Sequence, residues 1–196
     1  MRRRTFILYT LPFIPCADLG KPVSQSPAGE RYSLWFMPTG DVSDRLSGIV
    51  HRLSARYGAP EFSPHVTLLG GLVGPLQELL RKSACVSAAL RPFVIRLEKT
   101  DFLDEYFRCL FVHVALAEPL RKAHHAAHQA FGLRCEPVFM PHLSLLYGDF
   151  PQSLKEEAIA QMGSRLDVQF KVRSLHLYRT HREPRHWRRV ASFAIV

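Results

Sequence analysis

Two short stretches of the chain repeat the same order of residue types. Residues 63–71 are SPHVTLLGG, and residues 140–149 are MPHLSLLYGD. In each, a proline precedes His65 or His142, and an aliphatic residue, a hydroxyl residue and two leucines follow. A single histidine in a strand is usually structural, and the chain has ten histidines. The repetition of the whole phrase is what favours a function for this pair.

The residue types in the two stretches suit chemistry on a phosphodiester. Alternate side chains of a strand lie on one side, so Thr67 would lie beside His65, and Ser144 beside His142. Phosphodiester hydrolysis needs a base for water, an acid for the leaving oxygen and donors for the charged oxygens. An unperturbed histidine pKa of about 6.5 lets one imidazole be neutral and the other protonated near neutral pH. We expect two catalytic histidines and two phosphate-binding hydroxyls, with no metal and no cofactor.

The elements that must position these residues follow from apolar periodicity and turn residues. At 196 residues the chain is long enough for one domain with a sizeable core. Strands are predicted over 31–38, 65–71, 93–100, 106–116, 142–149, 170–181 and 188–196, and helices over 41–57, 75–90, 118–131 and 151–163. Each repeated phrase is thus a strand followed by a helix and then by two strands. This symmetry predicts an α+β fold of two similar lobes related by a pseudo-twofold axis, with mainly antiparallel sheets, helices outside and a central cleft.

The first residues differ in character from the rest. Residues 1–29 join a basic start and an apolar run to a linker rich in Gly, Pro and Ser. We expect them to form an N-terminal appendage, either a signal or a disordered segment, before a single domain at 30–196. No membrane span is predicted. We expect a cytoplasmic protein, with export through the N-terminal segment as the alternative.

The charge of the chain bears on its partner, and the spacing of its cysteines bears on metal binding. Lys plus Arg number 26 against 17 for Asp plus Glu, and arginines concentrate in residues 165–189. This excess indicates either an anionic partner or a solvated basic surface. The four cysteines show no zinc-binding spacing, and we interpret them as mostly buried thiols. The expected partners are a small cyclic-phosphate nucleotide or RNA 3′ ends, bound by a monomer.

The stretches PHVTLL and PHLSLLYG, with YSLWFMP and YFRCLFVHV, resemble the 2H phosphoesterase superfamily, and within it the plant-type cyclic phosphodiesterases. The resemblance covers about residues 31–195. It implies a two-lobed α+β fold that opens nucleoside 2′,3′-cyclic phosphates to 2′-phosphates and ADP-ribose 1″,2″-cyclic phosphate to the 1″-phosphate. It also implies that His65 is the base and His142 the acid. Tyr147, Trp35 and Phe107 would contact the substrate, with core packing as the alternative for each.

Other interpretations remain at this stage. An RNA-end enzyme resembling the 2′-5′ RNA ligases is one, although those proteins usually follow the second His motif with Arg, where this chain has Tyr147 and Gly148. A non-catalytic RNA-binding module is another. His124 and His128 have a spacing that metal ligands use, but no third ligand is near in sequence, so we interpret them as part of a solvated helix face. His113 and His176 are interpreted as structural.

Overall fold

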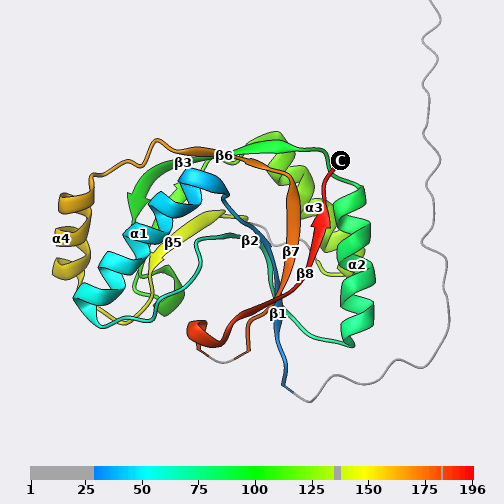
Figure 1. Cartoon of the computed structure of the whole chain (residues 1–196), viewed down its shortest axis with the longest axis horizontal. Helices are drawn as coiled ribbons and strands as arrows, with labels where there is room; N and C mark the ends of the chain where they lie inside the picture. Colours follow the sequence, from blue (N-terminus) through cyan, green and yellow to red (C-terminus); the bar gives the residue numbers. More distant parts are fainter. Residues whose placement is uncertain (1–28, 135–137, 182) are drawn as a thin grey trace, which may run out of the picture.

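In residues 29–134, 138–181 and 183–196, which the computed structural model describes, the strands form one antiparallel sheet of eight. Its order is β6-β3-β4-β5-β2-β1-β7-β8 (Figure 1). The strands are β1 Tyr32–Phe36, β2 Val66–Leu72, β3 Phe93–Asp101, β4 Leu110–Val114, β5 His142–Leu146, β6 Gln169–Val172, β7 Ser174–Arg179 and β8 Arg188–Ala194. The helices are α1 Gly40–Tyr57, α2 Leu76–Ala88, α3 Glu118–Phe131 and α4 Gln152–Met162, with short 3-10 helices η1 Tyr106–Arg108 and η2 Pro184–His186.

The sheet consists of two four-stranded halves joined at its centre. One half is β6-β3-β4-β5, the other is β2-β1-β7-β8, and they meet where Val66 pairs with Leu143. Each half is also packed against a helix that follows a strand of the other half: α1 follows β1 but contacts β5, and α3 follows β4 but contacts β2. The α+β prediction with two related halves is confirmed. The halves share one continuous sheet, so the two repeated strands are hydrogen-bonded neighbours.

The helix that follows β1 shows how the apolar pattern becomes packing. In α1, Leu46, Ile49 and Leu53 recur every three or four residues and are buried in the main core. The helix ends at Gly58, whose positive φ of 66° is a left-handed conformation that other residues adopt at a cost. The predicted helix and its end at residue 57 are therefore confirmed.

Two predicted strands are wrong in part. The strand predicted over 106–116 begins only at Leu110, because Tyr106–Arg108 form η1, and the strand predicted over 170–181 is not continuous. Residues 170–181 form two strands, because β6 pairs with β3 at one edge of the sheet and β7 pairs with β1 in the other half. The chain crosses between the halves from β6 to β7, along the top of Figure 1, and Arg173 is the residue between these strands. In β6 only alternate residues, Phe170 and Val172, are buried, whereas in β7 four successive residues from Leu175 to Tyr178 are buried. The two strands therefore lie in different surroundings, β6 at the edge of the sheet and β7 inside it.

Three further predictions concern the N-terminal appendage, the cysteines and membrane spans. The N-terminal appendage, apart from Gly29, lies outside the described residues. Cys109 is a buried free thiol, as expected, but Cys85 is disulfide-bonded, so the thiol prediction is wrong for that residue. Of the helices in the described ranges, none combines the length and apolarity that a bilayer crossing requires.

Candidate functional site

The joint between the halves brings the repeated residues together. Val66 of β2 pairs with Leu143 of β5, and both are fully buried in the core. Residues that face each other in an antiparallel pair project to the same side, so their chain neighbours project to the opposite side. The four predicted residues meet on that side, with His65 opposite Ser144 and Thr67 opposite His142. The two histidines are diagonal neighbours, with Cβ atoms about 7 Å apart.

The two imidazoles are held in matching ways. Nδ1 of His65 lies 2.7 Å from the carbonyl oxygen of Ser63, and Nδ1 of His142 lies 3.1 Å from that of Met140. In each case the acceptor is two residues earlier, across a proline. A carbonyl oxygen can only accept, so both Nδ1 atoms carry the proton and donate it. Both Nε2 atoms are thereby left to act on a substrate.

Burial changes the protonation of the pair. Loss of hydration lowers the pKa of His65 to about 4, although the bond to Ser63 opposes the shift, and the charge of His142 lowers the pKa further. Burial also lowers the pKa of His142 from 6.5, with the bond to Met140 in opposition and Arg108 and His113 as further causes. Both imidazoles are therefore neutral at pH 7 before an anion binds. This differs from the expectation that one of them is protonated near neutral pH.

The serine hydroxyl is part of a hydrogen-bonded chain. Ser144 Oγ donates to the carbonyl oxygen of Phe107 in η1 at 3.0 Å and is also bonded to Tyr147. Burial raises the pKa of Tyr147, so its phenol keeps its proton. The Tyr147 ring is stacked on Phe62 at 3.8 Å between centroids. Tyr147 thus fixes the hydroxyl of Ser144, and Thr67 lies half-buried across the sheet from it.

The predicted aromatic contacts divide into buried and exposed rings. Trp35 pairs with Thr67 and is only 2% exposed. One face of its indole is stacked on His65 at 3.6 Å, and the other on Tyr178 at 4.1 Å. Stacking of a base on Trp35 is therefore blocked, and this side chain dehydrates His65. Phe107 is 53% exposed, as a residue that contacts a ligand would be.

One aromatic residue at the site was missed in the sequence. Trp187, between η2 and β8, has its ring centroid 5.4 Å from that of Trp35 and 6.0 Å from that of His65. It also lies 6.1 Å from Phe107 and 5.9 Å from Tyr147. It therefore touches residues from both halves of the sheet. Its only sequence signal was an indole inside an arginine-rich run, which favours a surface loop rather than a site.

Of the other histidines, the two on α3 have different surroundings from those predicted. His124 and His128 are buried, 8% and 4% exposed, with their Nε2 atoms 3.0 Å apart, so the predicted solvated face is wrong. Within the described ranges, no three His, Cys, Asp or Glu side chains gather as a metal site. His176 is bonded to Ser192 at 2.9 Å, in agreement with a structural role. His113 lies opposite His142 on β4, beside the candidate site.

A central pair of His-x-hydroxyl strands on an antiparallel α+β sheet defines a 2H phosphoesterase. The chain belongs to the 2′-5′ RNA ligase superfamily, because residues 42–184 match the model of that family. It is also similar to a protein of Arabidopsis thaliana named cyclic phosphodiesterase, with 24% identity over 156 residues that cover 78% of this chain and 86% of the relative.

Solved structures share the fold at lower identity. The protein TT0787 of Thermus thermophilus matches with a TM-score of 0.61 and 18% identity, over 84% of this chain and 97% of that one. The E. coli LigT structure complexed with 3′-AMP matches with a TM-score of 0.55 and 13% identity, over 86% of this chain and 99% of LigT. These likenesses establish the architecture and leave the substrate to be argued from the site.

Proposed function

We propose that the protein hydrolyses small cyclic phosphodiesters with His65 and His142 as a general base and acid. The observation that carries the proposal is the cluster around the Val66 and Leu143 pair, in which both imidazoles donate Nδ1–H to the backbone. Membership in the superfamily and the similarity to a cyclic phosphodiesterase support it.

The reaction follows from the two free Nε2 atoms. Nε2 of His65, neutral because of its low pKa, removes a proton from water as the water oxygen bonds to phosphorus. The bond from phosphorus to one sugar oxygen breaks, and that oxygen takes the proton from Nε2 of His142. An anion bound between the imidazoles favours the protonated form of His142 before this step. The proton gained by His65 and the one lost by His142 are then exchanged with solvent.

The proposed substrates are small. We infer conversion of nucleoside 2′,3′-cyclic phosphates to 2′-phosphates, and of ADP-ribose 1″,2″-cyclic phosphate to the 1″-phosphate. Thr67 and Ser144 would bind the non-bridging oxygens, with Ser144 turned from Phe107 toward the phosphate. The exposed Phe107 and the half-buried Trp187 offer surfaces for a base or sugar.

A second candidate is an enzyme that acts on cyclic phosphates at RNA 3′ ends. The arginine-rich segment around Trp187 favours it, because Arg185 and Arg188 line a cavity of about 390 Å³ that also reaches Trp35. Turnover of a mononucleotide cyclic phosphate would be compared with that of an RNA with the same terminus. Faster turnover of the RNA would make it the main substrate. RNA binding that weakens steeply with salt, without product, would instead identify a binding module.

The main test is a phosphorus NMR assay of the purified full-length chain. Adenosine 2′,3′-cyclic phosphate and ADP-ribose cyclic phosphate are offered separately, and the signals of the products report both the reaction and the bond that breaks. We expect 2′-phosphate and 1″-phosphate products, no effect of a chelator, and loss of both products in His142→Ala. Full turnover by His142→Ala on every cyclic phosphate, or activity that a chelator abolishes and zinc restores, would contradict the proposal.

A further inference from the structure

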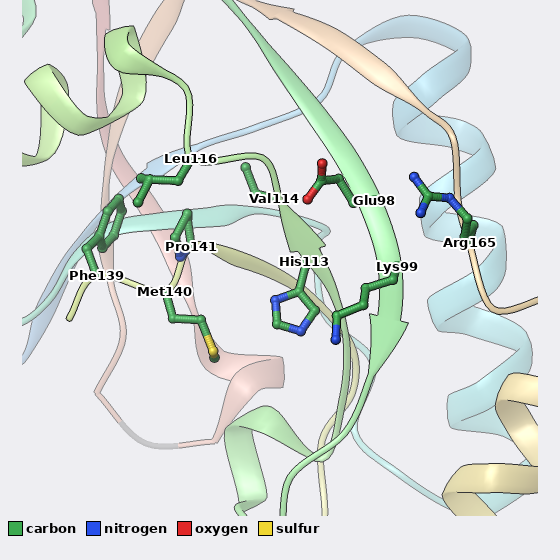
Figure 2. Close-up of a pocket in the computed structure, with 9 residues that line it drawn as sticks. All are labelled: Glu98, Lys99, His113, Val114, Leu116, Phe139, Met140, Pro141 and Arg165. Atoms are coloured by element: carbon green, nitrogen blue, oxygen red, sulfur yellow. The ribbon is translucent and has the colours of Figure 1, made fainter.

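The cations near the candidate site are of two kinds. In the pocket of about 370 Å³ beside β3 and β4, Lys99 and Arg165 lie at the surface (Figure 2). Their side chains are 61% and 60% exposed, and they are ion-paired with Asp101 and Asp167 respectively. Lys155 of α4 differs, because its side chain is only 2% exposed. Lysine is almost never buried unless its ammonium is paired, so the partners of Lys155 indicate what it holds.

Three successive residues surround the ammonium of Lys155. Nζ donates to the carbonyl oxygen of Leu103 at 3.1 Å and to Oδ1 of Asp104 at 2.5 Å. Nζ also lies 5.2 Å from the centroid of the Phe102 ring, within the range of a cation–π contact. Burial raises the pKa of the Cys109 thiol, directly after η1, and the charge of Lys155 opposes that rise. Lys155 thus ties α4 to the chain that leads from β3 through η1.

This stretch of chain, residues 102–108, is a hydrogen-bonded unit that we call the η1 segment. The backbone N–H of Leu103 donates to the carbonyl oxygen of Arg108 at 2.9 Å, and the N–H of Arg108 donates to that of Glu105 at 3.0 Å. The side chains of Glu105 and Arg108 are also ion-paired at 2.6 Å. Because these bonds close the segment on itself, a support at one of its ends holds all of it.

The η1 segment also forms part of the candidate site. The carbonyl oxygen of Phe107 accepts from Ser144 Oγ at 3.0 Å, and that of Tyr106 accepts from the N–H of Gly148 at 3.1 Å. The ring of Phe107 is 53% exposed, and its centroid lies 6.1 Å from that of Trp187. The position of the segment therefore decides where the Phe107 ring lies relative to the hydroxyl of Ser144.

We propose that Lys155 is a positioning residue for substrate binding, which holds the η1 segment and thereby places the Phe107 ring and the carbonyl oxygen bonded to Ser144. This inference rests on the proposed function, in which Phe107 contacts a base or sugar and Ser144 binds the phosphate. Both imidazoles donate to carbonyl oxygens outside the η1 segment. Loss of the ammonium should therefore weaken substrate binding more than proton transfer.

Steady-state kinetics of Lys155→Met tests this inference, because methionine keeps an unbranched side chain without the ammonium. On adenosine 2′,3′-cyclic phosphate we expect KM to rise on the order of tenfold and kcat to change by less than about threefold. Lys82→Met on α2 is the matched control, since Lys82 is also ion-paired, with Glu78 at 2.7 Å, and contacts a ring, that of Phe131 at 5.7 Å. It should keep the wild-type KM. An unchanged KM in Lys155→Met, or an equal rise in the control, would overturn the inference.

A second background separates positioning from a general loss of stability. In Phe107→Ala the ring that Lys155 positions is removed, so the added change Lys155→Met should raise KM by less than about threefold. A rise in KM of the same size with and without the Phe107 ring would overturn the inference.

Hydrogen exchange separates this inference from the proposed function, because it needs no turnover. The amides of Leu103 and Arg108 are bonded within the η1 segment, and we expect the segment to exchange on the order of tenfold faster in Lys155→Met than in the wild type. Faster exchange supports the hold of Lys155 on the segment even if no cyclic phosphate is hydrolysed. Unchanged exchange would overturn the inference even if the cyclic phosphodiesterase activity is confirmed.

Asp104→Ala provides the same test at the surface, whether or not Lys155→Met folds. The Asp104 side chain is 91% exposed, so its removal leaves the core packing intact. We expect exchange of the η1 segment and KM to rise in the same direction by about two- to threefold, because Leu103 and Phe102 still contact the ammonium. Exchange and KM that both match the wild type would overturn the inference.

Discussion

The His65 and His142 sides of the site share a backbone arrangement but differ in their surroundings. His65 is 6% exposed, with Trp35 stacked on its ring and Trp187 at its edge. His142 is only half-buried, and its neighbour on β4 is the polar His113. The common element is the Nδ1–H bond to a carbonyl oxygen two residues earlier. The backbone thus gives both imidazoles the same orientation, whereas the neighbouring side chains determine how far each imidazole is hydrated.

This difference supports the roles that we propose for two residues that the repeated phrase does not distinguish. Aromatic walls penalise a charged imidazole, so His65, with a pKa of about 4, is neutral at pH 7, which is the form that a general base must have before the reaction. His142 has access to water, from which it can take a proton, and to an anionic substrate, whose charge favours the protonated form. The proposed order, His65 as base and His142 as acid, therefore has a physical cause in the asymmetry of the two sides.

The largest expected effect comes from deletion of either imidazole. We predict that His65→Ala and His142→Ala each lower kcat by on the order of 10²–10⁴, because each removes one proton transfer. Steady-state kinetics on adenosine 2′,3′-cyclic phosphate is the measurement. His125→Ala, an exposed histidine of α3, is the control and should retain activity. If only one of the two variants loses activity, the two-imidazole mechanism is wrong.

The buried His65 should also make stability depend on pH. Its folded pKa of about 4 lies below the 6.5 of an unperturbed histidine, so the unfolded chain binds more protons between these values. Stability is fully present above pH 6.5 and is lost as pH falls toward 4, by about 3 kcal/mol from this residue. Urea unfolding of His65→Leu should show a smaller loss by that amount. An equal loss of stability in the wild type and in His65→Leu would contradict the low pKa. The control is His51→Gln, at an exposed position, which should lose the same stability as the wild type.

The two hydroxyls should contribute less than the imidazoles. Thr67→Val and Ser144→Ala are each expected to lower kcat/KM by roughly 10- to 100-fold, as loss of a hydrogen bond to a charged phosphate does. Ser144→Ala should also loosen Tyr147 and Phe107, which the serine connects, and so raise KM more than Thr67→Val does. Kinetics of both variants on one substrate checks this. Unchanged kcat/KM in both would remove the hydroxyls from the site.

The smallest effect should appear in the pH profile of the base. The acid limb of kcat/KM is expected near pH 4, where His65 becomes protonated. Trp187→Ala admits water to the imidazole, so we predict that the limb moves to higher pH by less than one unit. His186→Ala, an exposed change in the same segment, should leave the limb in place. A wild-type limb near pH 6.5 would contradict the low pKa of His65 and the effect of its aromatic surroundings.

The elements could be predicted wherever the apolar pattern was local. The helix at 118–131 was predicted with the bounds of α3, because its amphipathic face and Gly132 are adjacent in the chain. The break at Arg173 was missed because it depends on which strands the two segments pair with, β6 with β3 and β7 with β1, and those partners are distant in the sequence. The buried face of His124 and His128 was also missed, because imidazoles carry no fixed preference for water or core.

The sequence by itself determined which groups the site contains, since the two-residue period of a strand places His65 beside Thr67 and His142 beside Ser144 regardless of the rest of the fold. Only the tertiary structure decided that β2 and β5 are neighbours and that Trp187 lies against His65. The reason is physical. Side-chain alternation is a property of a few adjacent residues, whereas hydration and pKa depend on side chains such as Trp35 and Trp187, which the fold brings in from other parts of the chain.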